Sequence, residues 1–138
     1  TDHLYTAVPG HGAHCNGAVL KISGRVSLDG ASAAGPKAIT GKTQLRDRGI
    51  RQAGYVPSLA LRLAILAAGR IDLAVVRENA CDWDLAASDL LVQEAGGRLE
   101  DLRGRPLSYN RGSVRHPALV GGPKALVDPL RPILAELM

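Results

Sequence analysis

The sequence predicts an α/β domain in which helices flank a mixed sheet. In the second half of the chain, segments with helical periodicity alternate with short aliphatic runs, which is typical of layered α/β folds. Of the 138 residues, 46% are hydrophobic and 22% are charged, which is ordinary for a globular protein. A chain of this length can bury one hydrophobic core without disulfides or a structural metal. We therefore expect residues 1–138 to form a single α/β domain.

The first half of the chain predicts short strands joined by turns. Residues 4–8 form a β-rich run, and residues 10–17 are rich in turn formers and are expected to be loop. Asn16 and Gly17 both tolerate positive φ angles, so they predict a hairpin turn that leads into a strand at residues 18–22.

The pattern is weaker before the first long helix. Residues 24–37 have little periodicity and are predicted to be loop, with residues 25–28 as a candidate edge strand. We expect a short strand at residues 38–40 and a solvated connection or short helix over residues 41–51.

A capped helix opens the second half of the chain. Leucines recur at helical spacing between Ser58, a typical N-cap residue, and Gly69, a typical residue just past a helix end. The short run at residues 71–76 is dominated by aliphatic and β-branched side chains and predicts a buried strand.

The remaining elements continue the alternation. A second helix is expected to begin at Asp84 or a near neighbour and to end at Gly96 and Gly97. Its predicted apolar face consists of Ala86, Ala87, Leu90, Leu91 and Ala95. Strands are predicted at residues 98–102 and 118–120, and a last helix at residues 129–137, with Asp128 as its N-cap and Pro129 as its first residue.

Composition argues against several classes of function. The chain carries 17 Lys and Arg against 13 Asp and Glu, which gives a net charge of +4, but it has no Phe, three Tyr and one Trp. Nucleic-acid surfaces built on base stacking need aromatic side chains, so we expect no nucleic-acid partner. The basic excess suits a small phosphorylated substrate equally well.

Two features bear on location. The longest apolar stretch, residues 59–68, is interrupted by Arg62 and is too short to cross a bilayer, so no membrane association is expected. Cys15 and Cys81 match no metal or redox spacing and are interpreted as reduced thiols of a cytoplasmic protein. The chain opens at Thr1 with a predicted strand close behind, so we expect it to be a fragment of a longer protein.

The densest group of polar side chains lies at residues 77–84, between a predicted strand and a helix. Loops at the carboxyl ends of strands are where ligands of open α/β sheets bind. Asp82 and Asp84 flank the only tryptophan, and such carboxylates supply part of a Mg²⁺ site together with waters and phosphate oxygens. From spacing alone a simpler interpretation is favoured, in which Asp84 is only a helix cap and Asp82 is a solvated loop charge.

A wider pattern supports the first interpretation. Residues 82–87 read Asp-Trp-Asp-Leu-Ala-Ala, and residues 90–97 read Leu-Leu-Val-Gln-Glu-Ala-Gly-Gly. Together they resemble the C-terminal signature of the inositol monophosphatase superfamily, a Trp-Asp-x-Ala-Ala run that opens a helix ending in Glu-Ala-Gly-Gly. Residues 5–17, 66–72 and 101–110 are similar to further segments of the same family, so the resemblance covers nearly the whole chain.

The resemblance implies a fold and several site residues. The chain is expected to form the C-terminal half of an αβαβα sandwich, with Asp84 as a Mg²⁺ ligand and Ser58 as a contact to the substrate phosphate. Inositol-specific members bind a substrate hydroxyl through a Glu ahead of the Trp, where this chain has Arg77 with Glu78 beside it. An acidic residue directly before the Trp, here Asp82, is more similar to the bisphosphate nucleotidase branch.

One family motif is missing from the chain. The other metal ligands and the water-activating residues of the family come from an upstream acidic loop and an Asp-Pro-x-Asp-Gly-Thr motif, and neither is among the 138 residues. The resemblance thus implies a Mg²⁺-dependent phosphomonoesterase, acting on an inositol monophosphate or a 3′,5′-bisphosphate nucleotide, whose N-terminal half and catalytic residues lie outside this chain. It further implies a homodimer, and we expect the isolated chain to be inactive. The rival hypothesis, supported by the missing motif, is a non-catalytic α/β domain that binds a ligand or a partner.

Other candidates are weaker. His11 and His14 lie close together in a Gly-rich loop but lack the third ligand that zinc needs. Arg111, Arg115 and His116 are interpreted as a solvated basic loop.

Overall fold

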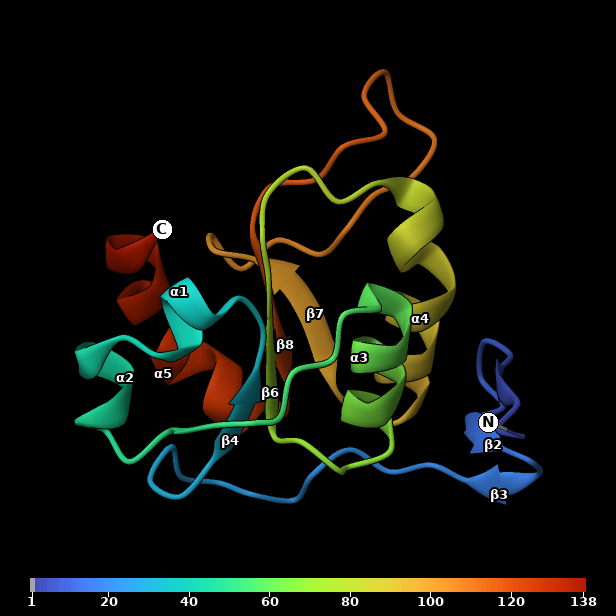
Figure 1. The fold of residues 1–138 in the computed structure, drawn as a ribbon. Helices are drawn as coiled ribbons and strands as arrows, with labels where there is room; N and C mark the ends of the chain where they lie inside the picture. Colours follow the sequence, from blue (N-terminus) through green and yellow to red (C-terminus); the bar gives the residue numbers. More distant parts are fainter. Residues whose placement is uncertain (1) are drawn as a thin grey trace.

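Two β-sheets organise the chain, whose computed structural model describes residues 2–138 (Figure 1). The smaller sheet is antiparallel, in the order β1-β2-β3. The larger is mixed, in the order β5-β4-β6-β8-β7, with β4 parallel to both of its neighbours and β8 antiparallel to both of its own. The strands are β1 (Tyr5–Ala7), β2 (Ala13–Cys15), β3 (Ala18–Val19), β4 (Ser32–Ala34), β5 (Arg51–Gln52), β6 (Leu73–Val76), β7 (Arg98–Asp101) and β8 (Leu119–Gly122).

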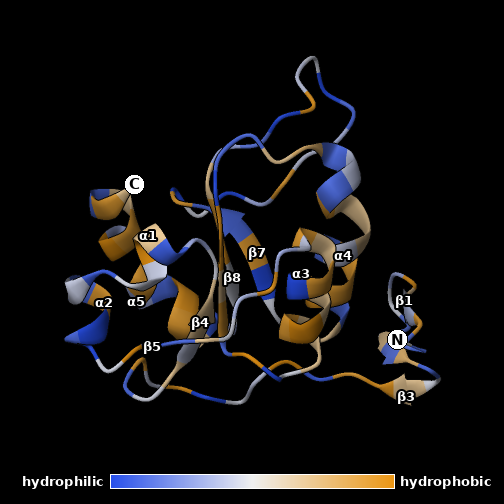
Figure 2. Cartoon of the chain, in the orientation of Figure 1, coloured by the Kyte–Doolittle hydropathy of each residue, from blue (hydrophilic) through white to orange (hydrophobic). Residues whose placement is uncertain are grey.

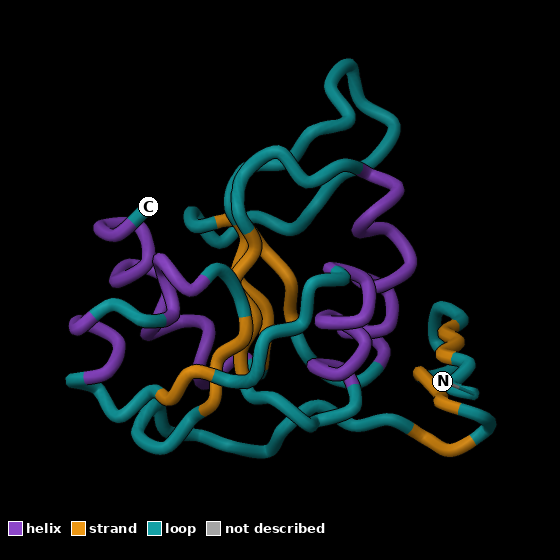
Figure 3. Tube along the Cα trace, in the orientation of Figure 1, coloured by secondary structure: helices purple, strands orange, loops and turns teal. Residues whose placement is uncertain are grey.

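Helices cover both faces of the five-stranded sheet, which confirms the predicted fold class. Figure 1 shows α3 (Leu59–Ala67) and α4 (Asp82–Glu94) on one face, and α1 (Lys37–Thr40), α2 (Thr43–Arg46) and α5 (Lys124–Leu137) on the other. The small sheet packs against the outer side of α4. The long connection between β7 and β8 projects beyond the sheet (Figure 3). No helix within residues 2–138 is long and apolar enough to cross a membrane.

Alternation along the strands explains why both faces are covered. In β6, Leu73 and Val75 join the core cluster with the leucines of α5, whereas Ala74 and Val76 join the cluster with α3 and α4. Successive side chains of a strand point to opposite faces, so a strand that is apolar throughout needs a layer on each side. The hydropathy colouring in Figure 2 shows hydrophobic stretches on α3, α4 and α5, the helices that flank the sheet.

The hairpin turn and the first long helix form as predicted, although the strand after the turn, β3, ends at Val19 rather than at residue 22. Asn16 and Gly17 have φ angles of 50° and 83° and join β2 to β3. The Ser58 side chain accepts a hydrogen bond from the Leu61 N–H at 3.2 Å and caps α3, and Gly69 follows the helix end with a φ of 74°.

Four predictions in the first half are wrong. Residues 38–40 belong to α1, because the Pro36 carbonyl accepts the N–H groups of Ile39 and Thr40 and starts a helical turn. β4 lies inside the predicted loop at 24–37, since its Ser-Ala-Ala sequence has little strand propensity and is held by parallel partners on both sides. Residues 25–28 are not a strand, and residues 10–17 contain β2.

Two helices differ from prediction in the second half. In α4 the residues Leu85, Ser88, Asp89, Leu91 and Val92 are buried, while Ala86 and Ala87 face outward. The last helix, α5, begins at Lys124 rather than at residue 129, and Pro129 and Pro132 lie inside it. Burial of its apolar stripe, Leu126, Val127, Leu130 and Leu134, outweighs the cost of about 3 kcal/mol for an internal proline.

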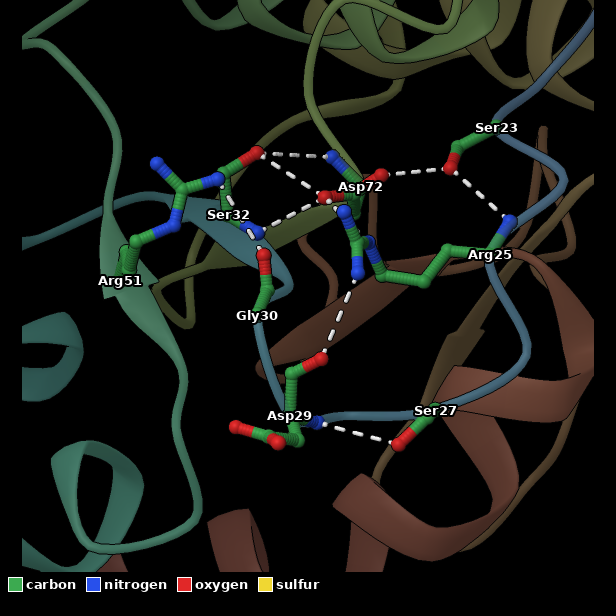
Figure 4. Close-up of polar contacts among 8 residues, drawn as sticks. All are labelled: Ser23, Arg25, Ser27, Asp29, Gly30, Ser32, Arg51 and Asp72. Carbon is green, nitrogen blue, oxygen red and sulfur yellow. Dashed lines mark hydrogen bonds and ion pairs between the residues drawn. The ribbon is translucent and has the colours of Figure 1, made fainter.

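A buried carboxylate fixes the start of β6. Asp72 accepts hydrogen bonds from the Ser32 N–H at 2.8 Å, from the Ser23 hydroxyl and from the Arg25 guanidinium (Figure 4). Burial acts to raise the pKa of Asp72, but these donors and the Arg25 charge outweigh it, so the pKa lies below its ordinary value. Asp72 precedes β6, so this cluster lies at the opposite end of the strand from residues 77–84.

Candidate functional site

The carboxyl ends of β4 and β6 lie at one edge of the sheet because the two strands are parallel. A cavity of about 560 Å³ opens there, between the segment that follows β4, the start of α3 and the segment that follows β6. The sequence-based expectation of a ligand at this edge follows from the same general rule, that ligands of open α/β sheets bind at the carboxyl ends of strands.

Two of the predicted substrate contacts line this cavity, and a third lies next to a lining residue. Arg77 and Glu78 follow β6, are exposed and line it directly. Ser58 caps α3, and the next residue, Leu59, lines the cavity. The Ser58 oxygen is engaged as a cap, but its hydroxyl proton is free to donate to an anion, so capping and substrate contact are compatible.

Both helices next to this edge begin there. α3 follows β5 and α4 follows β6, and the two helices pack side by side with their N-terminal ends toward the carboxyl edge of the sheet (Figure 1). The N-terminus of a helix carries partial positive charge and unpaired N–H groups. Two such ends at one edge favour an anionic ligand.

Asp84 lies in the first turn of α4 and is exposed. Its Oδ2 accepts the Cys81 N–H at 3.2 Å, so Cys81 is the N-cap residue and Asp84 completes a capping box. Its Oδ1 has no hydrogen-bond donor within residues 2–138 and can ligate a cation. One carboxylate fits a Mg²⁺ site only in part, and nowhere in residues 2–138 do three His, Cys, Asp or Glu side chains gather as a metal site. The Gly-rich loop with His11 and His14 is no exception.

Asp82 points to a different partner. Its Oδ1 lies 2.6 Å from Nε2 of His116, and its Oδ2 accepts the Asn110 N–H at 3.1 Å. The hydrogen bond with His116, followed by that from Asn110, holds the pKa of Asp82 below its ordinary value. His116 is therefore buried and paired, and its interpretation as part of a solvated loop is wrong, whereas Arg111 and Arg115 are exposed as expected.

A second hydrogen bond joins the same loop to α4, and the sequence analysis did not predict it. The Tyr109 hydroxyl donates to Oδ2 of Asp89 at 2.7 Å, and its ring lies 5.4 Å from the His116 ring, measured between centroids. Burial, reinforced by the Asp89 carboxylate, raises the pKa of Tyr109 above its ordinary value, so the hydroxyl remains a donor. The one available signal was Asp89 itself, a carboxylate on the buried stripe of a helix.

These geometric features can be set against known proteins. The model of the inositol monophosphatase family matches residues 1–131. The chain belongs to the inositol monophosphatase family. Relatives include the Nus factor SuhB of Pseudomonas aeruginosa, 37% identical over 128 residues, which cover 80% of this chain and 44% of that protein. The inositol-1-monophosphatase of Mesorhizobium japonicum is 37% identical over 125 residues, or 82% of this chain and 46% of the relative.

Solved structures of the family show the same fold. The Thermotoga maritima IMPase superposes with a TM-score of 0.81 at 26% identity, over 98% of this chain and 52% of that one. The chain thus spans about half the length of the family members it matches. In this member of the inositol monophosphatase family, the Trp-Asp signature lies at the start of α4, on the edge that carries the cavity.

Proposed function

We propose that the full-length protein is a Mg²⁺-dependent phosphomonoesterase, and that this chain provides the phosphate-binding edge and one metal ligand. The observation that supports this most directly is the placement of Asp84 at the start of α4, with one oxygen free, beside the equally oriented start of α3. The chain also belongs to the inositol monophosphatase family, and phosphomonoester hydrolysis is the reaction to which this arrangement is suited.

Each group has a distinct role in the proposed reaction. Ser58 and the N-terminal N–H groups of α3 bind oxygens of the substrate phosphate, because donors at a helix end are oriented toward an anion. Asp84 holds one metal through Oδ1. When bound, Mg²⁺ lowers the pKa of an attacking water and stabilises the leaving oxygen. Arg77 and Glu78 line the cavity in which the remainder of the substrate lies.

The other ligands and the water-activating residues are proposed to come from an upstream half of the same protein. Exposed apolar side chains on α3 and near the start of α4 support this partner. Trp83 and Leu61 are 75% and 46% exposed, and Ala60 and Ala86 are exposed on the same two helices. Burying such a surface against another layer would remove apolar area from water. We expect the assembled enzyme to be cytoplasmic, since both cysteines are free thiols.

The substrate is proposed to be a small phosphomonoester, either an inositol monophosphate or a 3′,5′-bisphosphate nucleotide. The structure places Asp82, which resembles the nucleotidase branch, against His116 rather than on the cavity. The choice between the two substrates therefore depends on the cavity lining and not on Asp82.

The substitution Asp84→Asn in the full-length protein tests the proposal. Asn retains an oxygen for the Cys81 N–H but is a poor Mg²⁺ ligand, so the fold should persist while Mg²⁺-dependent phosphate release falls by at least ~100-fold, more than is typical for a residue that only supports a ligand. The control is Asp47→Asn, on the exposed end of α2. Turnover by Asp84→Asn equal to that of the control would exclude Asp84 as a ligand, whereas no phosphate release by the wild type would favour a non-catalytic binding domain.

A further inference from the structure

The cavity at the carboxyl edge has a one-sided charge. Lys37 of α1, Arg62 of α3 and Arg77 after β6 line it, against the single carboxylate of Glu78. Within residues 2–138 none of these four side chains forms a salt bridge, so no carboxylate is paired with any of the three cations. Three cations from three separate elements therefore face one space with two positive charges in excess.

Arg62 is the most constrained of the three. Its Nη2 donates to the Val56 carbonyl at 2.9 Å, which fixes the guanidinium at the cavity wall. Its Nε is buried and has no hydrogen-bond partner within residues 2–138. Burial lowers the pKa of Arg62, because a guanidinium that loses water without gaining a counter-ion is less stable as a cation. An anion in the adjoining cavity would compensate for that loss.

The position of Arg62 along α3 relates it to the proposed reaction centre. Its backbone N–H donates to the Ser58 carbonyl at 2.9 Å, so the two residues are one helical turn apart on the same side of α3. Four residues of α-helix rise ~6 Å along the axis. An anion bound by Arg62 would thus lie about a turn away from a phosphate held at the helix start, a separation that a sugar or nucleoside can span.

We propose that the substrate carries a second anionic group, a phosphate or a carboxylate, and that Arg62, with Lys37 and Arg77, binds this group in the cavity. The proposal rests on the proposed function and narrows its substrate class. A substrate with only the scissile phosphate would leave these three cations without an anionic partner. Arg62 is a specificity-determining residue in this scheme, because it contacts the part of the substrate that does not react.

Matched substrate pairs test this in the full-length protein with Mg²⁺. One pair is adenosine 3′,5′-bisphosphate and adenosine 3′-phosphate, and the other is inositol 1,4-bisphosphate and inositol 1-phosphate. The wild type should show a higher kcat/KM for the doubly phosphorylated member of at least one pair. Arg62→Gln should lower that kcat/KM at least ~10-fold, mainly through KM, as expected for loss of a charge-assisted hydrogen bond, and should change the monophosphate value by less than ~3-fold.

Two further variants separate recognition from folding. Arg62→Lys retains a cation and should recover part of the preference, whereas Arg70→Gln, at an exposed position outside the cavity, should leave both substrates unchanged. Equal losses for both members of a pair in Arg62→Gln, together with a lower urea midpoint, would overturn the proposal and indicate a structural role for Arg62. Equal wild-type kcat/KM for both members of both pairs would overturn it as well.

Failure of the proposed function has a different signature. If the wild type releases no phosphate from any of the four compounds, the phosphatase assignment fails while the anion site stays testable by calorimetry without Mg²⁺. Adenosine 3′,5′-bisphosphate should then bind more tightly than adenosine 3′-phosphate, and Arg62→Gln should abolish the difference. Equal affinities would overturn the site too.

Discussion

The substitution Tyr109→Phe removes one hydroxyl group and should show how much its hydrogen bond, which joins the loop after β7 to α4, contributes to stability. Asp89 is 3% exposed and has two hydrogen-bond donors, the Tyr109 hydroxyl at 2.7 Å on Oδ2 and the Gln93 side-chain amide at 2.9 Å on Oδ1. Tyr109→Phe retains the ring against His116 but leaves Oδ2 without a donor. A hydrogen bond to a charged group contributes about 1.5–3 kcal/mol, so the free energy of unfolding should fall by about 2 kcal/mol.

Urea unfolding followed by circular dichroism gives this value. With an m value of about 2 kcal/mol per M, the midpoint should fall by about 1 M. Tyr5→Phe is the control, because the Tyr5 hydroxyl has no hydrogen-bond partner within residues 2–138, and its midpoint should not change. In an Asp89→Asn background the effect of Tyr109→Phe should drop to about 1 kcal/mol, the value for a neutral hydrogen bond. The same loss of unfolding free energy in both backgrounds, or a midpoint equal to that of the control, would refute the assignment of a hydrogen bond from Tyr109 to a charged Asp89 carboxylate.

Two further predictions concern folding. Gly69→Ala should destabilise the chain by about 1–2 kcal/mol, because residue 69 has a φ of 74° and an added Cβ would lie 2.8 Å from a backbone oxygen. Gly24→Ala, in open space, should have no effect in the same urea experiment, and equal stability of the two variants would contradict the helix-end assignment. Because the pKa of Asp72 is lower in the folded than in the unfolded state, its contribution is present above about pH 4 and is lost as the pH falls through the folded value. The urea midpoint should therefore drop as the pH is lowered below about 4, and less steeply in Asp72→Asn; parallel profiles would show that Asp72 is not responsible.

Helix α3 shows which features the sequence predicts well. Its leucine spacing, its Ser58 cap and the Gly69 that follows it are all local signals, because each depends on residues within about one helical turn. The Asn-Gly hairpin and strand β6 were predicted for the same reason. The Trp-Asp signature likewise placed Asp84 on the first turn of α4, at the edge that the structure shows to carry the cavity.

Contacts between distant segments account for what the sequence did not predict. Strand β4 is Ser-Ala-Ala and is a strand because β5 and β6 pair with it from both sides. The apolar stripe of α5 continues through Pro129 because the sheet buries it. His116 lies 34 residues from Asp82, and no local spacing links the two.

The sequence by itself determined the fold class, the family resemblance and the position of Asp84, since these depend on short-range periodicity, caps and contiguous motifs. Only the tertiary structure decided how the charges are grouped. It directed Asp82 to His116, tied Asp89 to Tyr109, and brought Lys37, Arg62 and Arg77 to one cavity. The physical reason is that parallel strands from separate parts of the chain end at a common edge, so side chains that are remote in sequence come together there.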